Sequence, residues 1–222
     1  DRGYGGDSAG VQEQLVDVAT VHSTSHAFAA LKGDGSVVTW GRSNSGGDNS
    51  QVLEQLVDVD RIFSTRFAFA ALKTDGFVVT WGDADYGGDS TWVQGQLVDV
   101  RDIYSTRFAF AALKADGSVV TWGDEDSGAD SSAVQEQLVA VQAIYSTWFA
   151  FAAVKADGSV LAWGDSKDGG DSTAVQEQLV GIDAVYSTSH AFAAVRGDGC
   201  VVTWGRSDSG ADSTAVQEQL RQ

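Results

Sequence analysis

The sequence predicts an all-β protein, a β-propeller of five 41-residue repeats, and three observations lead to this prediction. Trp-Gly pairs recur at a constant spacing of 41 residues, at Trp40, Trp81, Trp122, Trp163 and Trp204. Every repeat carries an Asp-Gly turn signal between two apolar runs, and Gly marks its other corners. One short sheet cannot bury both of its faces, so sheets repeated at a fixed period are expected to stack as propeller blades.

The repeats follow one another without insertion or deletion. The five units run over residues 7–47, 48–88, 89–129, 130–170 and 171–211, and partial units 1–6 and 212–222 flank them. Because no linker interrupts the series, we expect residues 1–222 to form a single domain. Residues 206–222 repeat the pattern of residues 1–17. The two ends therefore either compete for one place in a five-bladed ring or belong to an arc of a larger array.

Within each unit we expect three or four short antiparallel strands, and the third unit serves as the model. Its three clearest strands are predicted at residues 100–104, 108–113 and 118–122. The second alternates large and small residues, as suits a tightly packed strand. Asp116-Gly117 predicts a two-residue hairpin turn between the second and the third. In the third strand, Val120 and Trp122 should share one face, and Val119 and Thr121 the other.

A polar turn over residues 123–130 follows the Trp strand, and the segment after it is ambiguous. Residues 133–138 fit a fourth strand or one helical turn capped by Ser131 or Ser132. The rival architectures are a β-solenoid, or an α+β solenoid if this segment is helical. The recurring Trp favours the propeller. Each indole removes on the order of 150–250 Å² from water, worth roughly 4–6 kcal/mol, which explains why every unit keeps it.

Composition limits the classes of partner. The formal net charge is -17, from 31 acidic and 14 basic residues, so a nucleic acid is not expected as a ligand. This charge favours metal cations or a protein with a basic or mixed surface. Cys200 is the single cysteine, which excludes an intrachain disulfide.

No segment is expected to span a membrane. The longest uncharged run, residues 137–154, approaches spanning length, but its equivalents in the third unit carry Asp99, Arg101, Asp102 and Arg107. The chain has no Met and no signal-like N-terminus, as expected of a mature, trimmed or partial product.

The unit motif Ala-Leu-Lys-x-Asp-Gly-x-Val-x-x-Trp-Gly-Asp-x-x-x-Gly, at residues 112–128, resembles the regulator of chromosome condensation repeat. Small variations of it recur at 30–46, 71–87, 153–169 and 194–210. In texture the repeats are most similar to those of the bacterial propeller-type β-lactamase inhibitors. The resemblance implies a propeller, typically of seven blades, and leaves function open, since the family includes an exchange factor, a photoreceptor and inhibitors. The chain departs from the family where Gly-Gly-Asp-Ser or Gly-Ala-Asp-Ser replaces Gly-Gln-Leu-Gly, and where Ser105-Thr106 replaces a Gly.

Two adjacent positions ahead of the second predicted strand vary conspicuously among the units, and we call these residues the rim pairs. Positions that vary between repeats are not dictated by the blade. The resemblance places this loop at the rim of one propeller face, the face with which the inhibitors meet their partner. The ten residues, rich in types that dominate interface hot spots, are Ser25, His26, Arg66, Phe67, Arg107, Phe108, Trp148, Phe149, Ser189 and His190.

Two alternatives for the rim pairs remain open at this point. The Phe residues could instead plug the centre of the propeller as core, with the Arg side chains in solvent. The two His residues occupy equivalent positions without a nearby Cys or patterned carboxylates. They are therefore expected to be loop residues rather than metal ligands.

The polar turns offer a second candidate site. Carboxylates at alternate positions around a Gly bend could surround Ca²⁺, and the six candidates are Asp83, Asp85, Asp89, Asp124, Asp126 and Asp130. No further acidic ligand follows before Glu136, and Arg42 and Arg206 stand at the first position in the outer units. The simpler interpretation is that each Asp bonds the backbone of its own turn.

Catalysis is not expected, because no Ser-His-Asp order, Cys-His pair, phosphate loop or two-His metal motif stands out from the repeat. The sequence predicts a non-catalytic protein–protein interaction module, an accessory subunit of a larger assembly, that needs no cofactor. Three alternatives remain. One is an enzyme inhibitor that binds through one propeller face, the second is a structural or surface repeat protein, and the third is a Ca²⁺-dependent carbohydrate binder.

Overall fold

The computed structural model describes residues 5–214 as five antiparallel sheets of three strands, one sheet from each predicted unit. The strands of each sheet pair in the order in which they occur in the chain. The strands are β1 (Val18–Ser23), β2 (Ala27–Lys32), β3 (Val37–Gly41), β4 (Val59–Ser64), β5 (Ala68–Lys73), β6 (Val78–Gly82), β7 (Val100–Ser105), β8 (Ala109–Lys114), β9 (Val119–Gly123), β10 (Val141–Ser146), β11 (Ala150–Lys155), β12 (Val160–Gly164), β13 (Ile182–Ser187), β14 (Ala191–Arg196) and β15 (Val201–Gly205).

The hairpin turn of each unit is one residue longer than predicted. In the third unit the N–H of Lys114 donates to the carbonyl of Ser118 (2.9 Å), and the N–H of Gly117 donates to the carbonyl of Lys114 (3.0 Å). Only Gly117 has a positive φ, 80°. A two-residue type I′ turn would require positive φ at two residues, so the prediction of a two-residue loop is wrong. The loop is a three-residue one, closed by a left-handed Gly.

The ambiguous segment is a short helix and not a fourth strand. In the third-to-fourth unit connection it forms the 3-10 helix η8, with Val134 at its N-cap and no side-chain cap, so neither predicted serine caps it. The hydroxyl of Ser131 instead donates to Oε1 of Gln135 (2.7 Å). The 3-10 helices are η2 (Gln12–Gln14), η3 (Ser43–Ser45), η4 (Leu53–Gln55), η5 (Ala84–Tyr86), η6 (Gln94–Gln96), η7 (Glu125–Ser127), η8 (Gln135–Gln137), η9 (Ser166–Asp168), η10 (Thr173–Gln178) and η11 (Ser207–Ser209).

The core lies between the sheets, as the Trp periodicity predicts. In the third unit Trp122 is 5% exposed and stacks on Phe110 of the same sheet, with ring centroids 5.1 Å apart. Its indole N–H donates to the carbonyl of Gly87 in the preceding unit (3.1 Å). The corresponding Trp side chains make the same contact at 3.0 Å along the whole array. The recurring indole therefore joins each blade to the one before it.

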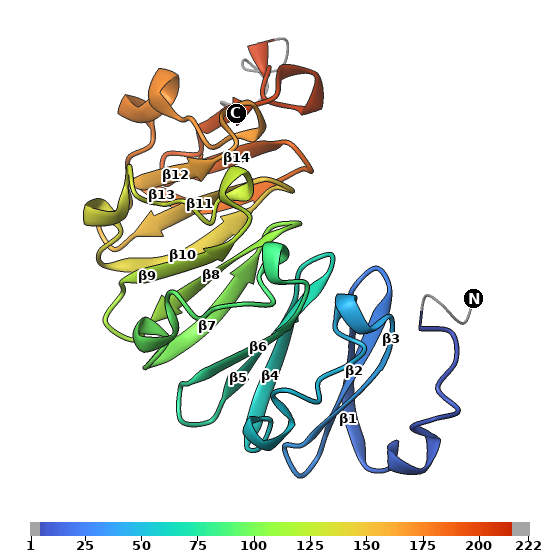
Figure 1. The fold of residues 1–222 in the computed structure, drawn as a ribbon. Helices are drawn as coiled ribbons and strands as arrows, with labels where there is room; N and C mark the ends of the chain where they lie inside the picture. Colours follow the sequence, from blue (N-terminus) through green and yellow to red (C-terminus); the bar gives the residue numbers. More distant parts are fainter. Residues whose placement is uncertain (1–4, 215–222) are drawn as a thin grey trace.

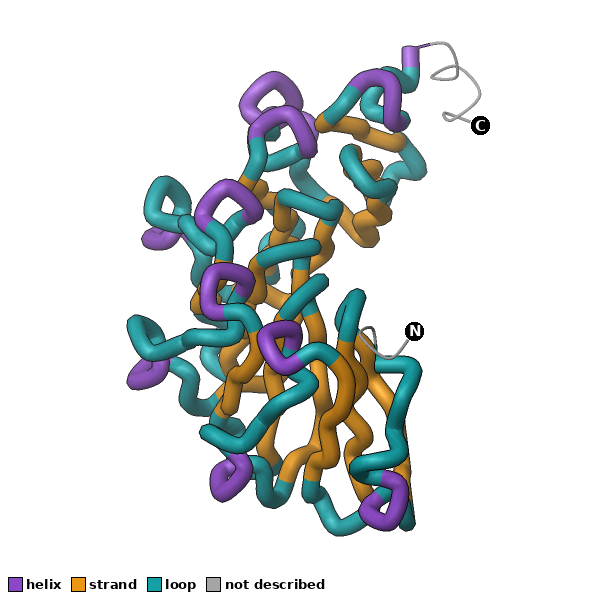
Figure 2. Tube along the Cα trace, turned by 45° about the vertical axis from the view of Figure 1, so that its right-hand side comes forward, coloured by secondary structure: helices purple, strands orange, loops and turns teal. Residues whose placement is uncertain are grey.

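The five sheets form an open arc. The first strands of successive sheets contact one another, which places β1, β4, β7, β10 and β13 along one side of the array. Figures 1 and 2 show the sheets fanned around this side, with an opening between the first sheet and the last. The arc, rather than a closed five-bladed ring, is thus the arrangement that the described chain adopts. The uncharged run at 137–154 forms most of β10 and β11, and no helix in residues 5–214 is long and apolar enough to cross a membrane.

Candidate functional site

A threonine fixes the bend that carries each rim pair. In the third unit Thr106 Oγ1 accepts a hydrogen bond from the N–H of Ala109 (3.0 Å) and donates one to the carbonyl of Ser127 (3.0 Å). The same two contacts recur in the four other units. A hydroxyl in this position replaces the backbone partners that a tight bend lacks. The Ser-Thr that distinguishes this chain from the family pattern therefore holds the rim in place.

Backbone hydrogen bonds connect the rim pairs of neighbouring units. In the first four units, the first residue of the pair donates its N–H to the carbonyl of the first residue in the next unit, over 2.8–2.9 Å. These bonds run from Ser25 to Arg66, from Arg66 to Arg107, from Arg107 to Trp148 and from Trp148 to Ser189. The structure therefore brings the five rim pairs, predicted from scattered positions of the sequence, into one continuous arc.

The second residues of the rim pairs form a row of aromatic rings, stacked on one another except for the tilted pair Phe108 and Phe149. Neighbouring ring centroids are 5.5 to 6.1 Å apart, and all five side chains are half-buried. The ring of Tyr86, which the sequence analysis did not single out, adds to the row with centroids 5.3 and 4.9 Å from two of the Phe rings. The rings are, in order, His26, Phe67, Phe108, Phe149 and His190. They pack against each other much as the alternative interpretation expected of core residues.

The first residues of the rim pairs have a different surrounding. Arg66, Arg107, Trp148 and Ser189 line an open hollow of about 620 Å³, together with Ser and Thr side chains of the neighbouring strand ends. Trp148 is 45% exposed, and the Arg107 guanidinium lies 4.6 Å from the centre of its ring. The rim pairs thus divide into a packed aromatic row and an accessible polar lining.

The charge of this hollow is opposite to that of the whole protein. Two guanidinium groups enter its lining, and none of its described lining residues is acidic. Arg66 lies 5.2 Å from the ring centre of Phe67, and Arg107 lies 5.8 Å from that of Phe108. Contact with the rings restricts both cations beside the hollow at a modest cost in side-chain freedom. The rim is therefore a cationic spot on a protein of net charge -17.

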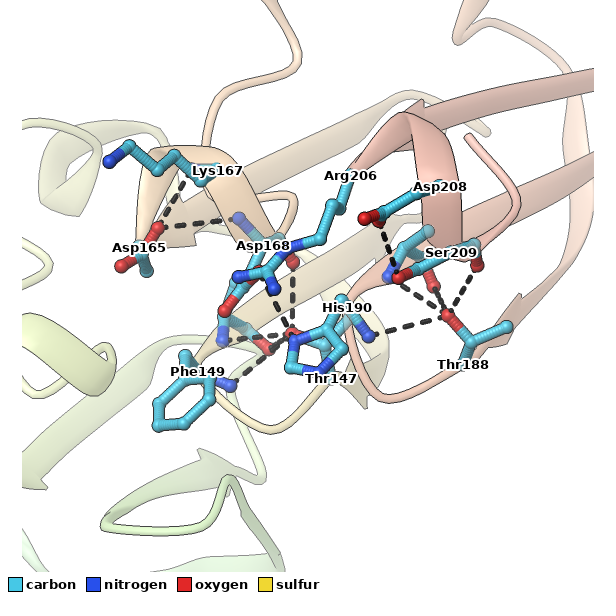
Figure 3. A network of polar contacts seen from close by, with 12 residues as sticks. Thr147, Phe149, Asp165, Lys167, Asp168, Thr188, His190, Arg206, Asp208 and Ser209 are labelled. Carbon is cyan, nitrogen blue, oxygen red and sulfur yellow. Dashed lines mark hydrogen bonds and ion pairs between the residues drawn. The ribbon is translucent and has the colours of Figure 1, made fainter. Parts of the chain in front are cut away.

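One ionic cluster at the rim was missed by the sequence analysis. Asp168 is 2% exposed, and its Oδ1 lies 2.7 Å from a guanidinium nitrogen of Arg206 and 3.2 Å from Nδ1 of His190 (Figure 3). A carboxylate that the sequence pattern did not reveal therefore lies beside His190. Asp168 replaces the Ser that three other units carry at this place, and this variation was the available signal. The contact crosses between blades, so spacing within one unit could not reveal it.

The acidic turns bind their own backbone. Asp83 accepts from the N–H of Asp85 (3.2 Å), and Asp89 accepts from that of Thr91 (2.9 Å). In the next unit, Asp124 bonds the hydroxyl of Ser127, and Asp130 accepts from the N–H of Ser132 (2.9 Å). Hydrogen bonds from the hydroxyl and then the N–H of Thr91 lower the pKa of the Asp89 carboxyl group, and the hydroxyl and N–H of Ser132 lower that of Asp130 in the same way. No three His, Cys, Asp or Glu side chains are grouped to hold a metal ion within residues 5–214.

Comparison with known proteins identifies the fold. No family model and no curated protein sequence matches the chain. Prp20p from Saccharomyces cerevisiae, the yeast RCC1, is 15% identical with a TM-score of 0.56, over 90% of this chain and 60% of its own. The CRINKLY WD40 ectodomain of the Arabidopsis thaliana receptor kinase ACR4 is 16% identical with a TM-score of 0.54, over 85% of this chain and 68% of its own. Human WBSCR16 is 16% identical with a TM-score of 0.52, over 87% and 63%.

These likenesses confirm the predicted architecture. The chain is an all-β, propeller-type repeat array with the fold of the regulator of chromosome condensation repeat. It spans 60 to 68% of the length of the three structures named above.

Proposed function

We propose that this chain is a non-catalytic protein-binding module that captures an acidic segment of its partner in the rim hollow. The proposal rests on one observation. The guanidinium-bearing Arg66 and Arg107 and the exposed Trp148 line the same concave surface, and none of the described lining residues carries a carboxylate. Arg and Trp are the residues that most often dominate protein interfaces, and concave surfaces are where such anchors are buried. Prp20p, which shares the fold, binds Gsp1p and histones, and this supports a binding role for such an array.

The charge distribution defines the partner further. A carboxylate reaching the hollow would meet Arg66 and Arg107 in the fork geometry that suits bidentate hydrogen bonds. Around the hollow, the net charge of -17 favours basic groups. The partner is therefore a protein of mixed surface, with Asp or Glu side chains on the inserted segment and Lys or Arg around it.

The rim is also rigid before binding. The bends are held by the Thr hydroxyls and joined by backbone hydrogen bonds, so docking orders little of the backbone. A preorganised site loses less conformational entropy on binding than a mobile loop does. Rigid presentation of recognition residues suits a subunit that docks into a larger assembly.

A display experiment tests the proposal. A phage library of random peptides is selected on the full chain, and the enriched peptides are measured by fluorescence anisotropy. We expect enrichment of Asp and Glu next to apolar residues. Binding of these peptides should weaken at least tenfold in Arg66→Ala and in Arg107→Ala, should also weaken in Trp148→Ala, and should weaken as salt rises.

Arg101→Ala is the matched control, because it removes the same charge from an exposed site at the other end of β7. Its peptide affinity should equal that of the unaltered chain. Circular dichroism and the melting temperature should stay unchanged in all four variants. Enriched peptides that bind the three rim variants as tightly as the unaltered chain would rule out the hollow. Enrichment of Lys and Arg would reverse the proposed chemistry of the partner.

A further inference from the structure

Each sheet of the array has two apolar faces. We call the face toward the preceding unit the leading face and the face toward the following unit the trailing face. Between the third and fourth sheets, Ala111 and Val119 of the trailing face pack against Val141, Ile144 and Phe151 of the next leading face. Equivalent side chains form the other three interfaces between neighbouring sheets. One interface is thus built four times within the chain.

Within residues 5–214, no sheet covers the leading face of the first sheet. Val18 is 37% exposed and Val21 is 54% exposed, whereas their equivalents Val59 and Ile62 are 5% and 3% exposed. The two strands pair in the same register, and both compared positions carry β-branched apolar residues in either sheet. The difference in exposure is therefore the area that a neighbouring sheet would bury.

No sheet within the described residues covers the trailing face of the fifth sheet either. Tyr186 is 64% exposed, while its equivalent Tyr145 packs against the core of the following interface. Val201 is half-buried, whereas the equivalent Val119 is 1% exposed. The two ends of the array therefore carry the two halves of the interface that the chain builds four times inside.

Polar groups at the two ends match in the same way. The rim series of backbone bonds stops at Ser189, whose N–H would next donate to the carbonyl of a residue equivalent to Ser25. Inside the array the hydroxyl of Ser64 donates to the carbonyl of Ser23 (2.9 Å), so Ser23 of a following copy would donate to Ser187. Each bond has its donor on one end face and its acceptor on the other.

The Gly hairpin turns show the same difference between inner units and the last unit in their backbone contacts. A Cβ on Gly117, in an inner unit, would lie 3.0 Å from the backbone of Ala140 in the next unit, and the carbonyl of Gly117 accepts from the N–H of Val141 (2.9 Å). The equivalent Gly199 has the same left-handed conformation, with φ 83°, and a Cβ there would meet nothing within 4 Å. The N–H of Val18 is the equivalent donor at the other end of the array.

We propose that the trailing face of the fifth sheet binds the leading face of the first sheet of a second copy, so that this chain associates head to tail. The contact continues the interface already present between neighbouring sheets, and the open arc keeps the two faces of one copy apart (Figures 1 and 2). Such a contact is heterologous, so it yields a ring if the rotation closes and a filament if it does not.

One local exchange accompanies the contact. Within one copy the indole of Trp40 already donates to the carbonyl of Gly5 (3.0 Å), which stands where inner units use the Gly of the preceding blade. Gly210 of the neighbouring copy is the equivalent residue and is also left-handed, with φ 109° against 81° at Gly5. Exchanging the carbonyl of Gly5 for that of Gly210 replaces one hydrogen bond of the Trp40 indole by an equivalent one. The free energy of association must therefore come from burial of the apolar faces. Each copy carries a net charge of -17, so screening by salt should strengthen the association.

Sedimentation velocity across the micromolar range tests the proposal. The full chain should form species larger than a monomer as its concentration rises, and more of them at higher salt. Val21→Asp places a charge on the leading face, and Tyr186→Asp places one on the trailing face. Both side chains are exposed, so each variant should keep the circular dichroism spectrum of the unaltered chain and sediment as a monomer.

Mixing the two variants gives the decisive result. Val21→Asp keeps an intact trailing face and Tyr186→Asp keeps an intact leading face, so an equimolar mixture should form a one-to-one dimer and nothing larger. Val139→Asp is the control, because Val139 is 51% exposed and lies on neither end face. It should associate as the unaltered chain does.

A full chain that stays monomeric at every concentration overturns the proposal. A mixture of the two variants that stays monomeric overturns it too, as does self-association of either variant alone, which would indicate a contact between like faces. The outcome is independent of the rim proposal, since Val21 and Tyr186 do not line the hollow. Peptide binding should be unchanged in both variants.

Discussion

The inner sheets and the end sheets share one sequence pattern but not one environment. The Phe of the middle strand is fully buried in the second to fifth units, whereas Phe28 of the first sheet is half-buried. The first sheet keeps the same strand register as the others. Burial in this array is therefore a property of neighbouring sheets, while strand pairing is a property of each unit. Substitutions at equivalent positions can separate the two contributions.

The largest difference is expected at the middle-strand Phe. Phe110 is 0% exposed, stacks on Trp122 and is covered by Gly87 of the preceding unit. Phe110→Ala should lower the free energy of unfolding by about 3–5 kcal/mol, because it leaves a cavity between two sheets. Phe28→Ala should cost clearly less, since that ring already meets solvent.

Urea unfolding followed by Trp fluorescence measures both values. Equal losses in the two variants would show that the Phe stabilises only its own sheet. Burial between neighbouring sheets would then add nothing measurable to the free energy of unfolding at this position.

The second comparison is between two equivalent Gly residues, one packed against the following unit and one at the end of the array. Gly87 has φ 99°, and a Cβ there would lie 2.6 Å from the ring of Phe110 in the following unit. Gly210 has φ 109°, and a Cβ there would meet only Thr188, at 3.9 Å. Both changes to Ala force a left-handed Ala, at roughly 1–2 kcal/mol. Gly87→Ala should cost roughly 1–3 kcal/mol more, since it also displaces a packed ring.

The measurement is the melting temperature of the two variants beside that of the unaltered chain. Gly87→Ala should melt at the lower temperature. Equal melting temperatures for the two variants would show that the ring of Phe110 moves aside without a cost in stability.

Much of the fold could be predicted from the sequence because the signals recur five times. The Trp spacing gives the units, and alternation places Val120 and Trp122 on one face, as the structure confirms. The short helix at Gln135–Gln137 could not be distinguished from a strand, since three residues are too few for a period to be visible. The Asp-Gly signal fits both two- and three-residue loops, so the choice between them depends on the pairing of the flanking strands.

The candidate site was predictable only in part. Variation between units identified the rim pairs, but the division into a stacked row and an exposed lining depends on how the blades stack. The Asp168 cluster shows this most clearly. Its partner His190 lies 22 residues further along the chain, in the next blade, and no spacing within one repeat connects the two.

The Asp168 cluster provides a comparison between two equivalent Arg residues. Both side chains are exposed, but within residues 5–214 only Arg206 has an ion-pair partner: it lies 2.7 Å from the carboxylate of Asp168, whose side chain is 3% exposed. Arg206→Ala should lower the free energy of unfolding by about 1–2 kcal/mol, since the buried carboxylate keeps only His190. Arg42→Ala should change it by less than about 0.5 kcal/mol.

Urea unfolding at pH 7 tests this pair. The double variant Arg206→Ala with Asp168→Ser should recover most of the loss, because three other units carry Ser at that place. Failure of the double variant to recover stability would mean that Arg206 acts through contacts other than Asp168.

The smallest effect is expected at the hairpin turns, where inner and end units should behave alike. Asp116 accepts hydrogen bonds from the N–H (2.9 Å) and hydroxyl (2.6 Å) of Ser118, and Asp34 makes the same bonds to Ser36 at 3.0 and 2.6 Å. These bonds lower the pKa of both carboxyl groups from the ordinary value of 3.8. A lowered folded-state pKa adds stability above that ordinary value, and this stability is lost as pH falls toward the folded-state pKa.

Asn keeps the accepting oxygen but does not titrate, so Asp116→Asn should change stability little at pH 7 and flatten its fall below the ordinary carboxyl pKa. Asp34→Asn should do the same to the same extent, because the turn is local and does not feel the neighbouring blade. Unfolding free energies measured from pH 7 down to pH 2.5 test both. A steeper effect in the inner unit would show that stacking reaches the turns as well, and the separation between pairing within units and burial between them would then fail.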